Sequence, residues 1–166
     1  MSRARVLLAV AALFVLTSCD GQQAAPVVSG EVKPLTIELP EQVLGLKVAQ
    51  EDVSGSLAAF KGRTYLESVG LFSMREGDLL RATYQVGRFN SLARAESKEF
   101  RRELAGLAGS PEELRMGSKE VSQVTGNQQI TYIWFEGRGL YVLTVHREFP
   151  FGRTLLRKLI EMEKQR

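Results

Sequence analysis

The stretch ITYIWFEGRGLYVLTV, residues 130–145, decides the fold of this chain. Two runs of β-branched and aromatic residues flank the segment 136–139, whose glycines permit the positive φ angles of a tight hairpin turn. With the two middle residues of that segment as the loop, Trp134 lies opposite Tyr141. The stretch therefore predicts a β-hairpin whose register is set by its own turn.

The side chains of this hairpin divide between two faces that are both apolar. One face carries Ile133, Phe135, Leu140 and Val142, and the other carries Tyr132, Trp134, Tyr141 and Leu143. We therefore expect two central strands that are covered on both sides. Tyr132, Trp134 and Tyr141 are candidates to line a ligand pocket, since aromatic rings supply much of the apolar surface of such sites. The alternative, which we favour, is that they are core residues of the hairpin.

A second hairpin is predicted upstream by segments 65–74 and 79–89, which flank the turn Arg75-Glu76-Gly77-Asp78. With the two middle residues of that turn at its centre, Met74 lies opposite Leu79. This pair has one wetter face, which is typical of a half-buried antiparallel hairpin.

The segments outside the hairpins predict two longer helices and a few short elements. An amphipathic helix runs from Asn90 or Ser91 to about Leu107, and a last helix covers about Thr154–Glu163 with leucines and an isoleucine on its buried side. The short elements are a strand over Leu35–Leu39, helical turns at Ser56–Lys61 and at the capping box Ser110-Pro111-Glu112-Glu113, and a strand around Glu120–Thr125.

This order of strands, helix, strands and helix predicts the α+β class. We expect a mainly antiparallel sheet with two longer helices packed on it, within a single domain over residues 35–166. A chain of this size can bury enough surface to fold around one apolar core.

The first 19 residues have the layout of a secretory signal. Arg3 and Arg5 precede an apolar run over residues 6–16, which is too short for a comfortable membrane span. Leu16, Thr17 and Ser18 then precede Cys19, the single cysteine of the chain. This pattern resembles the lipobox of bacterial lipoproteins; an ordinary signal peptide with a chance cysteine, or a short uncut anchor, are the alternatives.

The resemblance implies that residues 1–18 are removed and that Cys19 becomes a lipidated N-terminus. In that family the cysteine carries a thioether-linked diacylglycerol and often an N-acyl chain such as palmitate. Two or three acyl chains anchor a secreted protein stably, because each buried CH₂ contributes about 0.8 kcal/mol. Residues 19–34 are then the lipidated cysteine and a flexible tether, and we expect a lipid-anchored protein on the extracytoplasmic face of the cell membrane.

The rest of the chain is similar to small uncharacterised actinobacterial lipoproteins. The residues that carry this likeness are Tyr65–Phe72, the turn at Glu76-Gly77-Asp78, and Trp134–Arg138 before a strand. The final hairpin followed by a helix also resembles the PsbP-like secreted sandwich families. These likenesses imply a fold type and no catalytic residues.

Composition excludes several classes of function. The signal holds two of the 22 Lys and Arg residues and none of the 19 acidic residues, so the mature chain has a formal charge of +1 against +3 for the full chain. This near-neutral balance gives no case for nucleic acid as a partner. His146 is the only histidine, and with Cys19 acylated no thiol remains, so we expect no metal site, no cofactor and no disulfide.

The sequence leaves three functions open. The leading one is a non-enzymatic interaction or binding module that the membrane holds through Cys19, with an unknown envelope protein or small ligand as its partner. The second is a carrier or sensor of a small apolar ligand, which needs a cavity between sheet and helix. The third is an envelope hydrolase, which needs His146 or a pair of acids in a cleft.

Overall fold

Strands dominate the part of the chain that the structure describes. The structure is a computed structural model and describes residues 32–53 and 65–164. Its helices are α3 (Leu92–Glu96), α4 (Lys98–Leu107) and α5 (Gly152–Glu163). Its strands are β1 (Lys33–Pro34), β2 (Gln42–Val43), β3 (Leu46–Glu51), β4 (Leu66–Glu76), β5 (Leu79–Phe89), β6 (Glu112–Met116), β7 (Lys119–Thr125), β8 (Gln129–Glu136) and β9 (Gly139–His146).

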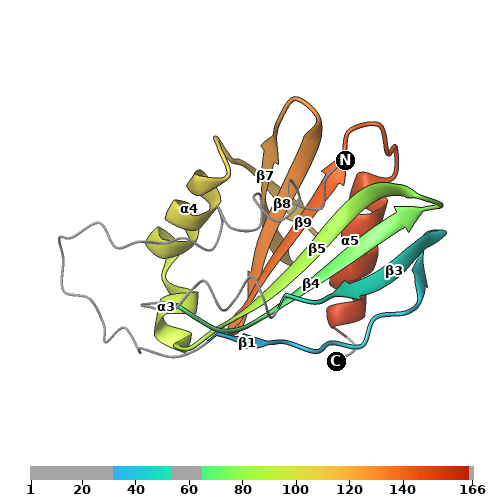
Figure 1. The fold of residues 1–166 in the computed structure, drawn as a ribbon. Helices are drawn as coiled ribbons and strands as arrows, with labels where there is room; N and C mark the ends of the chain where they lie inside the picture. Colours follow the sequence, from blue (N-terminus) through green and yellow to red (C-terminus); the bar gives the residue numbers. More distant parts are fainter. Residues whose placement is uncertain (1–31, 54–64, 165–166) are drawn as a thin grey trace.

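The nine described strands form one sheet in the order β2-β3-β4-β5-β9-β8-β7-β6. Neighbours along this order are antiparallel, and β1 adds a short parallel pairing to β4. The chain thus builds two antiparallel meanders, β2 to β5 and β6 to β9, which meet where β5 pairs with β9. Figure 1 shows the long β4 and β5 beside β9, with α4 and α5 on opposite sides of the sheet.

The expected α+β class is wrong. The structure is 50% strand and 21% helix, and its nine-stranded, mostly antiparallel sheet is nearer to a β-sandwich or barrel-like fold. The sheet gains β2 and β3 from a segment to which the sequence analysis assigns no element, and β6 from a segment predicted as a helical turn. Cross-strand hydrogen bonding and burial outweigh local helix signals in these segments, because propensity is a weak term beside tertiary packing.

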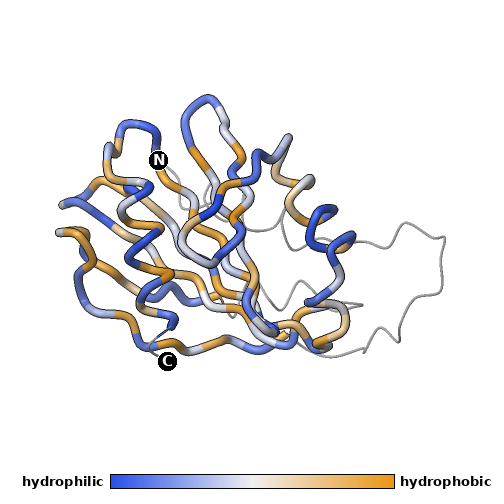
Figure 2. The backbone as a smooth tube through the Cα atoms, turned by 180° about the vertical axis from the view of Figure 1, so that it is seen from behind, coloured by the Kyte–Doolittle hydropathy of each residue, from blue (hydrophilic) through white to orange (hydrophobic). Residues whose placement is uncertain are grey.

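The two faces of the sheet bury separate apolar clusters. The α5 face carries Trp134 and Leu143, and it packs on the buried side of α5. The α4 face carries Ile133 and Val142, and it packs on residues of α3 and α4. In Figure 2 apolar colour runs along the strands, while the β7–β8 turn is hydrophilic. Both faces of the central strands are covered, as the hairpin pattern predicts.

The predicted register of the 130–145 hairpin is confirmed. Trp134 pairs with Tyr141 and Phe135 with Leu140, and Gly137 has a φ of 53° in the turn. The predicted register of the upstream hairpin is wrong, since Met74 pairs with Ala82 instead of Leu79. Its turn is centred one residue later than expected, at Gly77-Asp78, and a bulge at Arg81 on β5 shifts the pairing between Arg75 and Met74.

Outcomes for the remaining elements are mixed. The last helix and the strand near Glu120–Thr125 are confirmed as α5 and β7. The helix expected over residues 90–107 is interrupted at Ser97, whose backbone is extended and whose Oγ accepts a hydrogen bond from the N–H of Phe100 at 3.3 Å. The expected helical turn at Ser110–Glu113 is wrong, because Glu112 and Glu113 begin strand β6.

At the N-terminal side, the strand predicted over Leu35–Leu39 is also wrong. The strand lies at Lys33–Pro34, within the predicted tether, and Leu35 continues it with one backbone hydrogen bond to Val69. The helical turns predicted at Ser56–Lys61 lie outside the described residues.

Candidate functional site

The three aromatic residues that the sequence proposed as a ligand pocket do lie together, on the α5 face. Tyr132 and Trp134 alternate along β8, and Tyr141 faces Trp134 from β9. Trp134 has no exposed surface and Tyr132 is 2% exposed, while Tyr141 is partly buried. Their neighbours across the interface are the buried leucines of α5.

These rings pack into a continuous aromatic wall, made of Phe72, Tyr84, Trp134 and Tyr141. The indole of Trp134 stacks between two tyrosine rings, with its centroid 6.0 Å from that of Tyr84 and 5.4 Å from that of Tyr141. Phe72 continues the row from β4, with its centroid 6.1 Å from the Tyr84 ring. Such centroid separations are typical of stabilising aromatic pairs.

The polar edges of the wall meet the last turn of α5. Nε1 of Trp134 donates to Oε2 of Glu163 at 3.0 Å, and the hydroxyl of Tyr84 donates to the other carboxylate oxygen. One carboxylate thus satisfies two buried donors, and it ties the end of α5 to β5 and β8. Glu163 is a residue that the sequence reasoning missed as a partner, although its place at the end of an amphipathic helix is visible in the pattern.

Tyr132 lies beside the wall, near the start of α5. Burial raises the pKa of its hydroxyl above the ordinary value of 10.0, and the nearby Arg153 opposes part of that rise through its charge and a hydrogen bond. The hydroxyl is therefore neutral over the physiological range. The three predicted pocket residues are accordingly brought together as packed core, and the polar groups of Trp134 and Tyr132 are bonded to α5.

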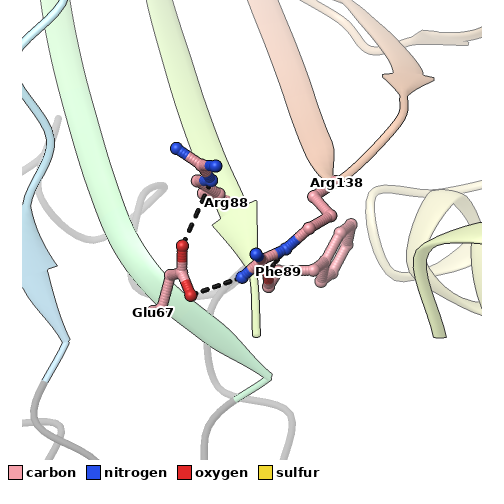
Figure 3. A network of polar contacts seen from close by, with 4 residues as sticks. All are labelled: Glu67, Arg88, Phe89 and Arg138. Atoms are coloured by element: carbon pink, nitrogen blue, oxygen red, sulfur yellow. Dashed lines mark hydrogen bonds and ion pairs between the residues drawn. The ribbon is translucent and has the colours of Figure 1, made fainter. Parts of the chain in front are cut away.

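A charged network lies at the turn end of the central hairpin, around the carboxylate of Glu67. Glu67 on β4 accepts from Nε of Arg88 at 3.1 Å and pairs with the guanidinium of Arg138, which belongs to the β8–β9 turn. Figure 3 shows the Glu67 carboxylate between the two guanidinium groups. Nε of Arg138 also donates to the carbonyl of Phe89 at 2.7 Å, and the N–H of Phe89 donates back to the Arg138 carbonyl at 2.8 Å.

The role of this network is to connect two parts of the fold. Its side chains are partly open to solvent, with the Glu67, Arg88 and Arg138 side chains 40%, 55% and 34% exposed. Ion pairs in such positions contribute little energy by themselves. The network fixes the end of the 130–145 hairpin to the end of the 65–89 hairpin, where the two meanders join.

Three exposed apolar side chains lie at the other end of the sheet. Leu44 is 44% exposed in the β2–β3 turn, Leu79 is 58% exposed after the β4–β5 turn, and Phe151 is 55% exposed after β9. The β3–β4 and β5–β9 registers put these three segments at one end, which we name the tip surface. Sequence reasoning missed it, although apolar residues inside or next to turns are its visible signal.

The other candidate residues from the sequence analysis form no catalytic or metal-binding cluster among the described residues. Leu16, Thr17, Ser18 and Cys19 lie outside the described residues. His146 ends β9, with its Nδ1 3.9 Å from a carboxylate oxygen of Glu148. Within residues 32–53 and 65–164, no three His, Cys, Asp or Glu side chains gather in a way that could hold a metal ion. In the same ranges, none of the helices has the length and apolar character needed to cross a membrane.

Comparisons with known proteins give no further assignment. No family model matches the chain, and neither a curated protein nor a solved structure matches it.

Proposed function

We propose that this protein is a lipid-anchored, non-enzymatic interaction module on the outer face of the cytoplasmic membrane. The lipobox-like residues Leu16 to Cys19 and the predicted tether after them support the location. The tip surface is the single observation that carries the interaction, because three large exposed apolar side chains at one end of a small domain favour a protein contact there.

The position of the tether favours this arrangement. β1 begins at Lys33 and pairs with Ser68, which is near the start of β4, whereas the tip surface lies beyond the end of β4. The eight residue steps from Ser68 to Glu76, at about 3.3 Å each, separate the two places by roughly 26 Å. Figure 1 shows β1 at one end of the sheet and the β4–β5 turn at the other. The tip surface is thus held on the side away from the anchor.

The packed aromatic wall speaks against the second hypothesis, the carrier of a small apolar ligand. That function needs a cavity between sheet and helix, yet Tyr84, Trp134 and Leu155 are each 1% exposed or less at this interface. The interaction module needs no such cavity, so it is the function that we retain.

Two variants test the proposal in the native bacterium. Cys19→Ala is expected to abolish labelling by a palmitate analogue and to move the protein from the membrane fraction to a soluble fraction. An unlabelled wild-type protein, or a Cys19→Ala variant that stays in the membrane fraction, would contradict the anchor.

For the contact surface, Leu79→Asp is expected to remove the crosslinked adducts that the wild-type protein forms in intact cells. Leu92→Asp is the matched control, because Leu92 is 48% exposed but lies on α3, away from the tip surface. If both variants keep every adduct, or if both lose the same adducts, the tip surface is not the contact site.

A further inference from the structure

Strand β6 forms one edge of the sheet in the part of the chain that the structure describes. The sheet order ends at β6, which pairs with β7 on its inner side. At the opposite end of the order β2 has two residues, whereas β6 has five and pairs without a bulge. A regular edge strand presents a row of unpaired N–H and C=O groups to a further strand. β6 can therefore accept one.

The turn between β6 and β7 fixes which backbone groups point outward. The loop between Met116 and Lys119 has two residues, so these flanking residues exchange hydrogen bonds across the turn. Hydrogen-bonded and non-hydrogen-bonded pairs then alternate along the two strands. The N–H and C=O groups of Glu113 and Arg115 therefore point away from β7, and no backbone bond to another described segment uses them.

The order of charges on β6 selects one pairing with a second copy of the same strand. Two copies related by a twofold axis run antiparallel here, and their outward backbone groups must meet. A register centred on Glu113 or on Arg115 places two like charges directly opposite each other, which is destabilising. A register centred on Leu114 places each Glu113 opposite Arg115 of the second copy. This register alone pairs both outward residues within the strand.

The side chains of β6 agree with the register centred on Leu114. Glu113 and Arg115 are both exposed and share one face of the strand. The Glu113 carboxylate accepts from Oγ of Ser122 at 2.8 Å, and a carboxylate can accept further hydrogen bonds. Leu114 points to the other face, where it is half-buried against the α5-face cluster. Contact with Leu114 of a second copy would cover the rest of its surface.

We propose that β6 is a self-association edge, to which a second copy of this chain adds its own β6 in the antiparallel register centred on Leu114. Two hydrogen-bonded residue pairs with two bonds each then join the copies, together with two pairs of opposite charge. A five-residue strand buries little area, so the dimer is a weak one. In the sheet order β6 lies four places from β5, so this edge is separate from the tip surface.

Disulfide trapping tests the register without relying on the proposed anchor. The full chain carrying Cys19→Ser is purified in detergent, so that an introduced cysteine is the single thiol. Leu114→Cys is expected to form a disulfide-linked dimer under mild oxidation. The reason is that Cα atoms in a non-hydrogen-bonded antiparallel pair lie about 4.5 Å apart, within disulfide range.

Glu112→Cys is the matched control, because Glu112 is more exposed than Leu114 but faces Met116 of the second copy in this register. Its own counterpart lies four residues further along, at roughly 13 Å. Glu112→Cys should therefore stay monomeric alone and form a mixed dimer with Met116→Cys. If Leu114→Cys does not fold, this mixed pair takes its place, with circular dichroism as the measure of folding.

A charge exchange tests the pairing of Glu113 with Arg115. Arg115→Glu, added to Leu114→Cys, sets like charges opposite each other and should slow disulfide formation about 10-fold, because two attractive pairs become repulsive. Adding Glu113→Arg restores opposite charges and should restore the rate. Leu79→Asp on the tip surface should leave the rate unchanged, which separates this edge from the proposed protein contact.

Four outcomes would overturn the self-association edge. The first is a Glu112→Cys chain that links to itself as fast as Leu114→Cys does, which indicates random collision. The second is the absence of any linked dimer from Leu114→Cys and from the mixed pair. The third is a double charge variant that stays as slow as Arg115→Glu. The fourth is loss of the dimer in Leu79→Asp, which would assign the association to the tip surface.

Discussion

Trp134 offers the strongest test of whether the aromatic wall is packed core or the lining of a cavity. Its side chain has no exposed surface, stacks on two tyrosine rings and donates to Glu163. Truncating a fully buried tryptophan to alanine costs about 3 to 5 kcal/mol of unfolding free energy. Losing a hydrogen bond to a carboxylate adds about 1 to 3 kcal/mol. We expect Trp134→Ala to cost about 5 kcal/mol.

That loss is large for a domain of this size. Domains of roughly 130 residues have unfolding free energies on the order of 10 kcal/mol, so about half of the stability would disappear. Trp134→Phe keeps an aromatic ring in the stack but removes the N–H donor, and it is expected to cost about 2 kcal/mol. The matched control is Phe151→Ala, which removes an aromatic ring that is 55% exposed and should cost less than about 1 kcal/mol.

The assay is urea unfolding of the full chain, followed by circular dichroism so that the signal does not depend on the tryptophan. The slope of the transition must stay constant between variants for the free energies to be compared. A Trp134→Ala variant within about 1 kcal/mol of the wild type would refute the packed-core interpretation, because only the lining of an open cavity loses a large ring at so small a cost.

The remaining predictions concern the hydroxyl of Tyr132 and the Glu67 network. Because the pKa of Tyr132 is raised on folding, its contribution to stability is fully present below about pH 10 and is lost as the pH rises through the folded-state pKa. Ultraviolet difference titration against Tyr132→Phe should show this, and Arg153→Gln should move the pKa further upward; an unchanged pKa would contradict the contact. In the Glu67 network, Arg138→Ala should cost about 1 kcal/mol in urea unfolding through the lost bond to Phe89, while Arg88→Ala should cost less than about half of that. Equal losses for the two arginines would show that the carbonyl contact is unimportant.

Local signals predicted the 130–145 hairpin down to its residue pairs. Gly137, with its positive φ, places the turn, and the length of the turn then fixes which residues of the two strands face each other. The upstream hairpin shows the limit of the same reasoning. Its turn offers two centres, and the bulge at Arg81 on β5 shifts the pairing, so the local pattern does not specify which residues face each other.

The sequence predicts which aromatic residues of the candidate site share a face. It does not predict whether that face is an open pocket or packed core. The alternation of β8 predicts that Tyr132 and Trp134 share a face, and the register adds Tyr141. Whether that face is open or filled depends on Tyr84, which pairs with Leu143 from another hairpin, and on Glu163 from the last helix. Contacts between segments so far apart in the chain leave no periodic signal.

The sequence by itself determined the central hairpin, the last helix, the near-neutral charge and the signal-like start that ends at Cys19, because each depends on neighbouring residues. Only the tertiary structure decided that Glu112–Met116 is a strand, that β5 joins β9, and that the sheet outweighs the helices. These outcomes depend on cross-strand hydrogen bonds and burial between distant segments, and their combined free energy exceeds the local preferences that the sequence displays.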